Sequence, residues 1–308
     1  MTYFFKKRRP TVTIVLPKNY HIIEELEKNR VQCVSQELAL KEDIRALRIG
    51  ILNVMPVAET YEFSLLHPLG RSVLQIEPIW IKLHNHAYSS SNSKHLEDFY
   101  IHFEEAISSR QLDGLVLTGA PVEELPFENV HYWGELTRIL KYAHTNISST
   151  LGICWGGLAL ARFLGIDKVH YPEKMFGVYE TVNLDRSHRI TGDMDDLFWC
   201  AQSRHAGIPD DVLEAEAAKG TVRLLAYAKG AGYTIFESAD QRFLIHLGHP
   251  EYEPERIVKE YNRDRDKGRT DVRMPLNFNI DKPINSWRSH RNEFFSQWVK
   301  FVHESTTY

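Results

Sequence analysis

Four apolar runs, each ending at a turn residue and each separated from the next by a segment of helical character, dominate the first half of the 308-residue chain. This alternation is typical of a doubly wound, mostly parallel β-sheet flanked by helices (an α/β fold), because buried parallel strands need helical crossovers. The predicted strands are 48–55, 74–83, 112–119 and 147–153, and the predicted helices are 63–74, 95–107 and 130–144. Sites in such sheets lie at the carboxyl ends of the strands, so Met55, Thr118 and Cys154 should line one crevice.

The second half of the chain is richer in predicted strands. They cover 198–201, 223–228, 233–237 and 242–247, and helices are predicted for 254–266 and 290–303. No internal repeat or low-complexity linker divides the chain. We therefore predict one α/β domain over 48–308, preceded by an N-terminal arm, 1–47, with a short strand at 12–16 and a helical stretch at 20–29.

Composition narrows the class of protein. A net charge of −4 does not favour binding to a polyanion, so no nucleic-acid partner is expected. No apolar segment is long enough to span a bilayer, so no membrane partner is expected either. The three cysteines are an odd, sparse set without a C-x-x-C pair, which argues against disulfides and against a structural zinc site. These features predict a cytoplasmic protein with no metal.

Cys154 occupies the junction between a predicted strand and a predicted helix. Gly156 and Gly157 permit a tight turn there, and residues 158–164 begin a helix. A helix N-terminus favours the thiolate, which is the nucleophilic form of cysteine. The alternative is that Cys154 is a small buried apolar residue, which is common for a lone cysteine.

A second stretch, 241–251, supplies a partner for the thiol. It reads as a strand followed by a turn with His249 and Glu251, two positions apart. In an extended segment residues i and i+2 point the same way, so the carboxylate can approach the imidazole, fix its tautomer and raise its basicity. The pattern predicts a triad in which Cys154 is the nucleophile, His249 the base and Glu251 the residue that orients the base.

The pattern from Gly152 to Gly156, with a distant His-Pro-Glu, resembles the class I glutamine amidotransferase-like superfamily. Longer motifs are similar to the homoserine O-acyltransferases of methionine synthesis; they lie at 118–133, 248–252, 260–264 and 286–290. The resemblance runs from about residue 48 to about residue 301. It implies transfer of an acyl group from acyl-CoA to an enzyme cysteine and then to an amino-acid hydroxyl. It also implies a homodimer that acts on small molecules, with acyl-CoA as co-substrate and no other cofactor.

The resemblance assigns roles by position. Cys154 matches the acyl-thioester nucleophile, His249 the proton acceptor and Glu251 its partner. The substrate-binding positions match Lys174, Ser203 and Arg263, of which the arginine would grip the amino-acid carboxylate through its bidentate fork. In the mechanism that this implies, the backbone N–H groups of Trp155 and Ala120 would hold the oxyanion.

Glu123 bears on the acyl donor. The family position after Thr-Gly-Ala-Pro-x separates acetyl from succinyl donors, since a glycine leaves room for the longer chain and a glutamate repels its distal carboxylate. Glu123 therefore implies acetyl-CoA, with succinyl-CoA as the alternative donor. If Glu123 faced solvent, as its neighbour Glu124 could, this inference would fail.

One departure from the family pattern leaves the acceptor open. Two lysines usually follow Met-Pro at the end of the first strand, whereas this chain has Val57 and Ala58 after Met55 and Pro56 and a shorter run beyond them. L-serine is then as good a candidate acceptor as L-homoserine, because one methylene is worth only about 1–3 kcal/mol of discrimination. The same scaffold could also serve a glutaminase or amidase, or a binding protein without activity.

Overall fold

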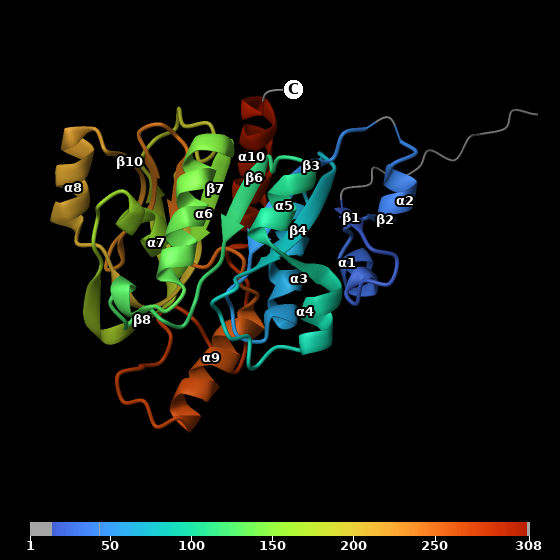
Figure 1. Ribbon diagram of the computed structural model, residues 1–308. Helices are drawn as coiled ribbons and strands as arrows, with labels where there is room; N and C mark the ends of the chain where they lie inside the picture. Colours follow the sequence, from blue (N-terminus) through green and yellow to red (C-terminus); the bar gives the residue numbers. More distant parts are fainter. Residues whose placement is uncertain (1–13, 43, 307–308) are drawn as a thin grey trace, which may run out of the picture.

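A single mixed β-sheet forms the centre of the protein in the computed structural model, which describes residues 14–42 and 44–306 (Figure 1). Its strand order is β2-β1-β4-β3-β6-β7-β12-β11-β10-β8-β9, and β5 pairs with β4 outside this path. The strands are β1 (Ile14–Leu16), β2 (Cys33–Ser35), β3 (Leu47–Leu52), β4 (Ile76–Lys82), β5 (Tyr100–His102), β6 (Gly114–Leu117), β7 (Ser149–Ile153), β8 (Val169–Asn183), β9 (Leu197–Gly207), β10 (Val222–Ala228), β11 (Gly232–Ser238) and β12 (Phe243–His246).

Helices fill the connections between these strands. They are α1 (Ile23–Lys28), α2 (Gln36–Ala39), α3 (Ala58–Leu69), α4 (Ser93–Phe99), α5 (Phe103–Ser109), η1 (Phe127–Asn129), α6 (Trp133–Asn146), α7 (Trp155–Phe163), α8 (Asp210–Lys219), α9 (Pro254–Asp266) and α10 (Arg288–Ser305). In the part of the chain that the structure describes, no helix combines the length and the apolar character needed to cross a membrane.

The sheet is parallel from β2 to β12 and antiparallel beyond it, which confirms the predicted mostly parallel, doubly wound fold. Within the predicted arm, 1–47, β1 pairs in parallel with β4, so this segment extends the sheet at one edge. Residues 1–13 of the arm lie outside the described residues.

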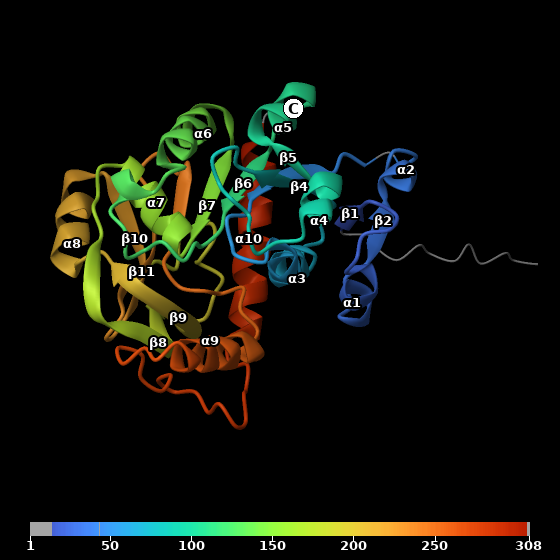
Figure 2. The ribbon, with the colours of Figure 1, turned by 60° about the horizontal axis from the view of Figure 1, so that its bottom comes forward.

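Two helical layers cover the sheet, one on each face. Buried side chains of α3 and α10, such as Leu65 and Trp298, pack in one core cluster with Ile49 of β3. Buried side chains of α6 and α7, such as Leu136 and Leu158, pack in the other cluster. Figure 2 shows α5 and α6 on the opposite side of the sheet from α3 and α10.

The structure corrects one sequence-based expectation and adds two elements for which the sequence analysis made no prediction. The single helix predicted for 95–107 is wrong, because 100–102 pairs with 80–82 of β4 as the short strand β5 and divides α4 from α5. The strand β8 was missed, because Pro172 and charged neighbours obscure its apolar pattern. The helix α8, 210–219, was also missed; its alanine- and acid-rich sequence has only Leu213 buried.

Candidate active site

Cys154 lies in a tight turn between β7 and α7. Its backbone has φ 52° and ψ −114°, a conformation that L-residues rarely adopt. The turn depends on close backbone contacts at two glycines. A Cβ on Gly156 would lie 2.3 Å from the Leu117 carbonyl oxygen, and one on Gly152 would lie 2.6 Å from the Gly156 carbonyl oxygen. The Gly-Ile-Cys-Trp-Gly stretch is therefore the sequence that lets this turn close.

Two backbone segments lie close to Cys154, namely the first residue of α7 and the turn after β6. Trp155 is the first residue of α7, so no carbonyl of the helix can reach its N–H. The Gly119–Ala120 turn after β6 borders the same spot, since a Cβ on Gly119 would lie 3.6 Å from the Cys154 Cβ and 3.5 Å from the His249 Cε1. Ala120 lines the cavity that also contains Cys154, whereas Trp155 is fully buried and is not among the residues that line it, so the oxyanion role of the two N–H groups stays a prediction.

His249 and Glu251 follow β12, the parallel neighbour of β7. The pairing of His246 with Ile153 sets the two strand ends side by side, so Cys154 and His249 meet at one sheet edge. The His249 Nδ1 lies 2.7 Å from the Glu251 Oε1, and both side chains are buried. Burial lowers the pKa of His249, but the charges and hydrogen bonds of Cys154 and Glu251 outweigh it and raise the pKa well above its usual range. These contacts favour the imidazolium form of His249.

Glu251 has a second partner that the sequence did not reveal. The Tyr61 hydroxyl, on α3, donates to Glu251 Oε1, while Glu251 Oε2 has no hydrogen-bond partner among the described residues. The Tyr252 ring stacks on the His249 ring with centroids 4.0 Å apart. No spacing pattern connects Tyr61 to 249–251, because the two are joined only by the packing of α3 against the site.

Lys174 and Ser203 meet two acidic residues of α9. The Lys174 Nζ lies 2.7 Å from Asp264 Oδ2 and 3.7 Å from Glu260 Oε2, and the Ser203 hydroxyl donates to Glu260 Oε2 at 2.5 Å. The Ser203 carbonyl oxygen is 3.9 Å from the Cys154 Sγ. Lys174 is therefore a buried member of a charged cluster and not a solvated surface residue.

Glu260 is the centre of this cluster. The motif at 260–264 contains it, but the sequence alone did not identify it as a site residue. It accepts hydrogen bonds from Tyr252 at 2.8 Å and Arg256 at 3.3 Å in addition to Ser203. Burial raises the pKa of Glu260, but the charges of Lys174 and Arg256 and the Ser203 hydrogen bond bring it down to about 2. These contacts favour the ionised form of Glu260, whose charge is balanced within the cluster by Lys174 and Arg256.

Glu123 points into the cavity. Its Oε1 accepts a hydrogen bond from the His205 backbone N–H at 3.1 Å, and burial raises the pKa of its carboxyl group. Glu124 is exposed instead and pairs with Arg269 at 2.9 Å. The structure therefore separates the two adjacent glutamates, with Glu123 on the inner side.

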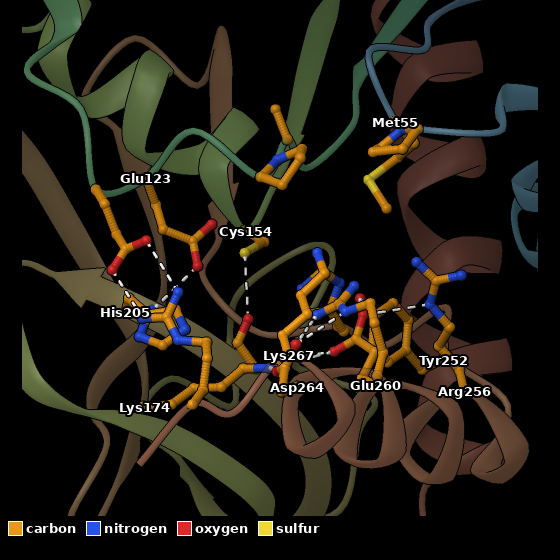
Figure 3. A pocket seen from close by; sticks show the side chains of 18 of the residues that line it. Met55, Glu123, Cys154, Lys174, His205, Tyr252, Arg256, Glu260, Asp264 and Lys267 are labelled. Carbon is orange, nitrogen blue, oxygen red and sulfur yellow. Dashed lines mark hydrogen bonds and ion pairs between the residues drawn. The ribbon is translucent and has the colours of Figure 1, made fainter. Parts of the chain in front are cut away.

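One cavity of about 460 Å³, shown in Figure 3, is lined by Cys154, His249, Lys174, Ser203 and Glu123. Cys154 lies at its centre, Glu123 and His205 lie on one side and Met55 on the other, and α9 forms the floor of the view. Arg263 also lines the cavity; its half-exposed guanidinium is 2.7 Å from Asp264 Oδ1.

The wall that departs from the family pattern is apolar. Met55, Pro56 and Val57 line the cavity, and Val57 is at the first of the two positions where the family usually has lysine. Val57 has φ 53° and ψ 59°, a left-handed conformation that is unusual for a β-branched residue. The shorter run after β3 is therefore accommodated by a strained turn directly before α3.

The fold and the grouping of cysteine, histidine and glutamate define a protein of the class I glutamine amidotransferase-like type. Solved structures share this fold. A glutamine amidotransferase from Thermotoga maritima matches with a TM-score of 0.52 at 12% identity, over 84% of this chain and 99% of that one. The glutaminase domain of Trypanosoma brucei CTPS matches with a TM-score of 0.52 at 12% identity, over 85% and 96%.

Sequence similarity narrows the class. The chain belongs to the homoserine O-succinyltransferase family, whose model matches residues 13–308. It is 38% identical over 303 residues to the homoserine O-acetyltransferase of Petrotoga mobilis, covering 96% of each chain. It is 38% identical over 302 residues to that of Geobacillus kaustophilus, covering 96% of this chain and 98% of the other. The family resemblance inferred from the motifs is confirmed.

Proposed function

We propose that this protein transfers an acetyl group from acetyl-CoA, through a thioester on Cys154, to the side-chain hydroxyl of L-homoserine. One observation carries the proposal: a cysteine, a histidine paired with a carboxylate and a half-buried glutamate line one cavity. They are Cys154, His249 and Glu123. Relatives named homoserine O-acetyltransferase support the acceptor and the donor. The reaction needs no cofactor besides the two substrates.

The first half-reaction uses Cys154 as the thiolate and His249 as the imidazolium. The Cys154 thiolate attacks the acetyl carbonyl, and the N–H groups of Trp155 and Ala120 donate hydrogen bonds to the developing oxyanion; such a donor is typically worth about 10²–10³ in rate. The carbon–sulfur bond to CoA breaks, and the His249 imidazolium gives its proton to the departing CoA thiolate. Cys154 is left as an acetyl thioester and His249 as a neutral imidazole.

Acylation also prepares the second half-reaction. The thioester carries no charge, so it removes the largest influence that keeps the pKa of His249 high in the resting enzyme. Burial then favours the neutral ring, which is a base. His249 takes the proton of the acceptor hydroxyl, the oxygen attacks the thioester, and collapse of the tetrahedral intermediate restores thiolate and imidazolium. The protons balance over the full cycle.

The position of Glu123 supports acetyl-CoA as the donor. Its side chain lines the cavity, and it has no lysine or arginine partner among the described ion pairs, whereas Glu260 and Asp264 are paired with Lys174. A succinyl chain would bring a second carboxylate toward Glu123, and like charges at short range in a buried site are unfavourable. On the acceptor side, Arg263 offers a guanidinium for the amino-acid carboxylate at the half-exposed mouth.

The decisive experiment is mass spectrometry after mixing the protein with acetyl-CoA alone. A hydroxylamine-labile acetyl adduct on Cys154 is expected, and Cys154→Ala should form none and should lose transfer activity. Cys200→Ala is the matched control, because Cys200 is also buried but lies 3.8 Å from His246, away from the cavity. Acetyl transfer by Cys154→Ala at a rate near that of the wild type would exclude the thioester route.

L-Serine is a second candidate acceptor, because Val57 lines the cavity at a position where the family usually has lysine, and this change could alter the acceptor pocket. Steady-state rates with L-homoserine and L-serine, each with acetyl-CoA and succinyl-CoA, separate the possibilities. A higher kcat/KM for L-serine would reassign the acceptor and leave the thioester mechanism intact. Release of glutamate from glutamine, without acyl transfer, would instead indicate a glutaminase.

A further inference from the structure

A second cluster of polar side chains surrounds the fully buried carboxylate of Glu62, which follows Tyr61 in α3. Its Oε1 accepts from the Tyr100 hydroxyl at 2.7 Å and lies 2.7 Å from the His95 Nε2. Its Oε2 accepts from the Tyr20 hydroxyl and lies 3.7 Å from the His21 Nδ1. Among the described ion pairs, Glu62 has histidines but no lysine or arginine as partners. A buried carboxylate of this kind needs a nearby positive charge.

The hydrogen bonding of His21 leaves one ring nitrogen facing this carboxylate. Its Nε2 lies 3.4 Å from the Glu59 carbonyl oxygen, and a carbonyl only accepts, so Nε2 carries the hydrogen. The Nδ1 of a neutral ring then carries a lone pair and lies 3.7 Å from Glu62 Oε2. Two acceptors at this separation repel each other unless a proton or a metal ion lies between them.

The geometry suits a metal ion at that position. Ligands held about 2.0–2.2 Å from a tetrahedral zinc ion are separated by roughly 3.3–3.6 Å, close to the 3.7 Å between His21 Nδ1 and Glu62 Oε2. The ligand atoms of His21, Glu62 and His95 all lie within 4.8 Å of one another. The Glu59 carbonyl also provides the outer hydrogen bond that metal-binding histidines usually make.

We propose that His21, Glu62 and His95 bind a divalent transition-metal ion, with zinc as the best fit to two imidazoles and one carboxylate. His95 would bind through Nε2 as the tautomer with its hydrogen on Nδ1, in place of the hydrogen bond that it now makes to Glu62. The half-exposed His21 side chain gives the ion a path from solvent, and a water molecule can complete four-coordination.

Another group of similar composition does not qualify. Glu124, His205 and Asp271 also have ligand atoms within 4.8 Å of one another. The guanidinium of Arg269 already lies between the two carboxylates, 2.9 Å from Glu124 and 2.6 Å from Asp271. That cation satisfies the site, whereas the Glu62 cluster has no such cation among its described ion pairs.

Bound metal would tie three separate segments together. His21 precedes α1, Glu62 belongs to α3 and His95 belongs to α4. Because α3 also carries Tyr61, the ion would anchor the helix that supports Glu251. Its role is therefore structural, and it does not depend on which acyl group or acceptor the enzyme uses.

The test measures zinc bound by untagged protein after EDTA treatment and re-equilibration with zinc sulfate, together with the thermal midpoint. It is done in Cys154→Ala as well, because a reactive thiolate also binds zinc. About one zinc ion per chain and a higher midpoint are expected in both proteins. His21→Asn should weaken binding at least about tenfold, and so should His95→Asn.

His144→Asn is the matched control, since His144 has a similar exposure and also pairs with a carboxylate, Asp240, at 2.6 Å. It should bind zinc as the parent does. His21→Asn decides the outcome if His95→Asn does not fold, because the His21 side chain is 38% exposed. The proposal is wrong if Cys154→Ala binds no zinc, or if His21→Asn binds it as tightly as His144→Asn.

Discussion

Tyr61→Phe tests whether the site depends on the support of Glu251 from α3. Among the described residues, the Tyr61 hydroxyl is the only donor to Glu251 besides His249, and it is buried with the carboxylate. A hydrogen bond to a charged group is worth about 1.5–3 kcal/mol. At about 1.4 kcal/mol per tenfold, kcat/KM would fall about 10- to 150-fold if all of this energy acts in the transition state. We expect a loss near the lower end, because the hydrogen bond from Tyr61 to Glu251 is already present in the ground state.

The assay is the steady-state acetylation of the amino acid, and its control is Tyr132→Phe. Tyr132 is another fully buried tyrosine, but its hydroxyl has no partner in the described part of the chain, so this variant should keep nearly full activity. A double-mutant cycle with Glu251→Gln separates positioning from general packing. The effect of Tyr61→Phe should largely vanish in that background.

Two results would refute this reasoning. One is a loss in Tyr61→Phe no larger than that in Tyr132→Phe. The other is an equal loss from Tyr61→Phe in the presence and in the absence of the Glu251 carboxylate. In either case the short contact between Tyr61 and Glu251 would have no part in orienting His249.

Two further predictions concern donor choice and pH. Glu123→Gly should raise the ratio of kcat/KM for succinyl-CoA to kcat/KM for acetyl-CoA at least about tenfold. The control is Glu124→Gly, a change at the exposed neighbour that should leave this ratio unchanged. The same ratio in Glu123→Gly and in the wild type would contradict the role of Glu123. Burial opposes ionisation of Glu253, but His67 and Arg291 lower its pKa to about 2 from 4.5. The ionised carboxylate therefore stabilises the fold fully above pH 4.5 and loses this effect toward pH 2. Over this range the free energy of unfolding of Glu253→Gln should fall less steeply with decreasing pH than that of the wild type.

The sequence predicts best where local pattern and tertiary environment agree. The apolar run before Cys154 and the glycines after it specify a buried strand, a tight turn and a helix, and the structure has all three. The run 243–246 gives the neighbouring strand in the same way. Because both strands are parallel neighbours, the meeting of Cys154 and His249 follows from the fold class.

Prediction fails where long-range contacts decide the structure. Residues 100–102 have helical surroundings, but pairing with β4 makes them a strand. The Tyr61 hydroxyl reaches Glu251 across 190 positions of sequence, so no local spacing could indicate it. Glu260 and Asp264 are one helical turn apart on α9, but only the structure shows that Lys174 of β8 lies close to both.

The backbone of Cys154 has a consequence for the protein as a whole. A non-glycine residue held in such a rare region of φ and ψ costs on the order of 1–3 kcal/mol, which is a considerable part of the net stability of an ordinary domain. Glycine at this position would remove the strain, but in the proposed mechanism it would also remove the nucleophile. The surrounding strands and helices must therefore be stable enough to hold a strained cysteine in this turn.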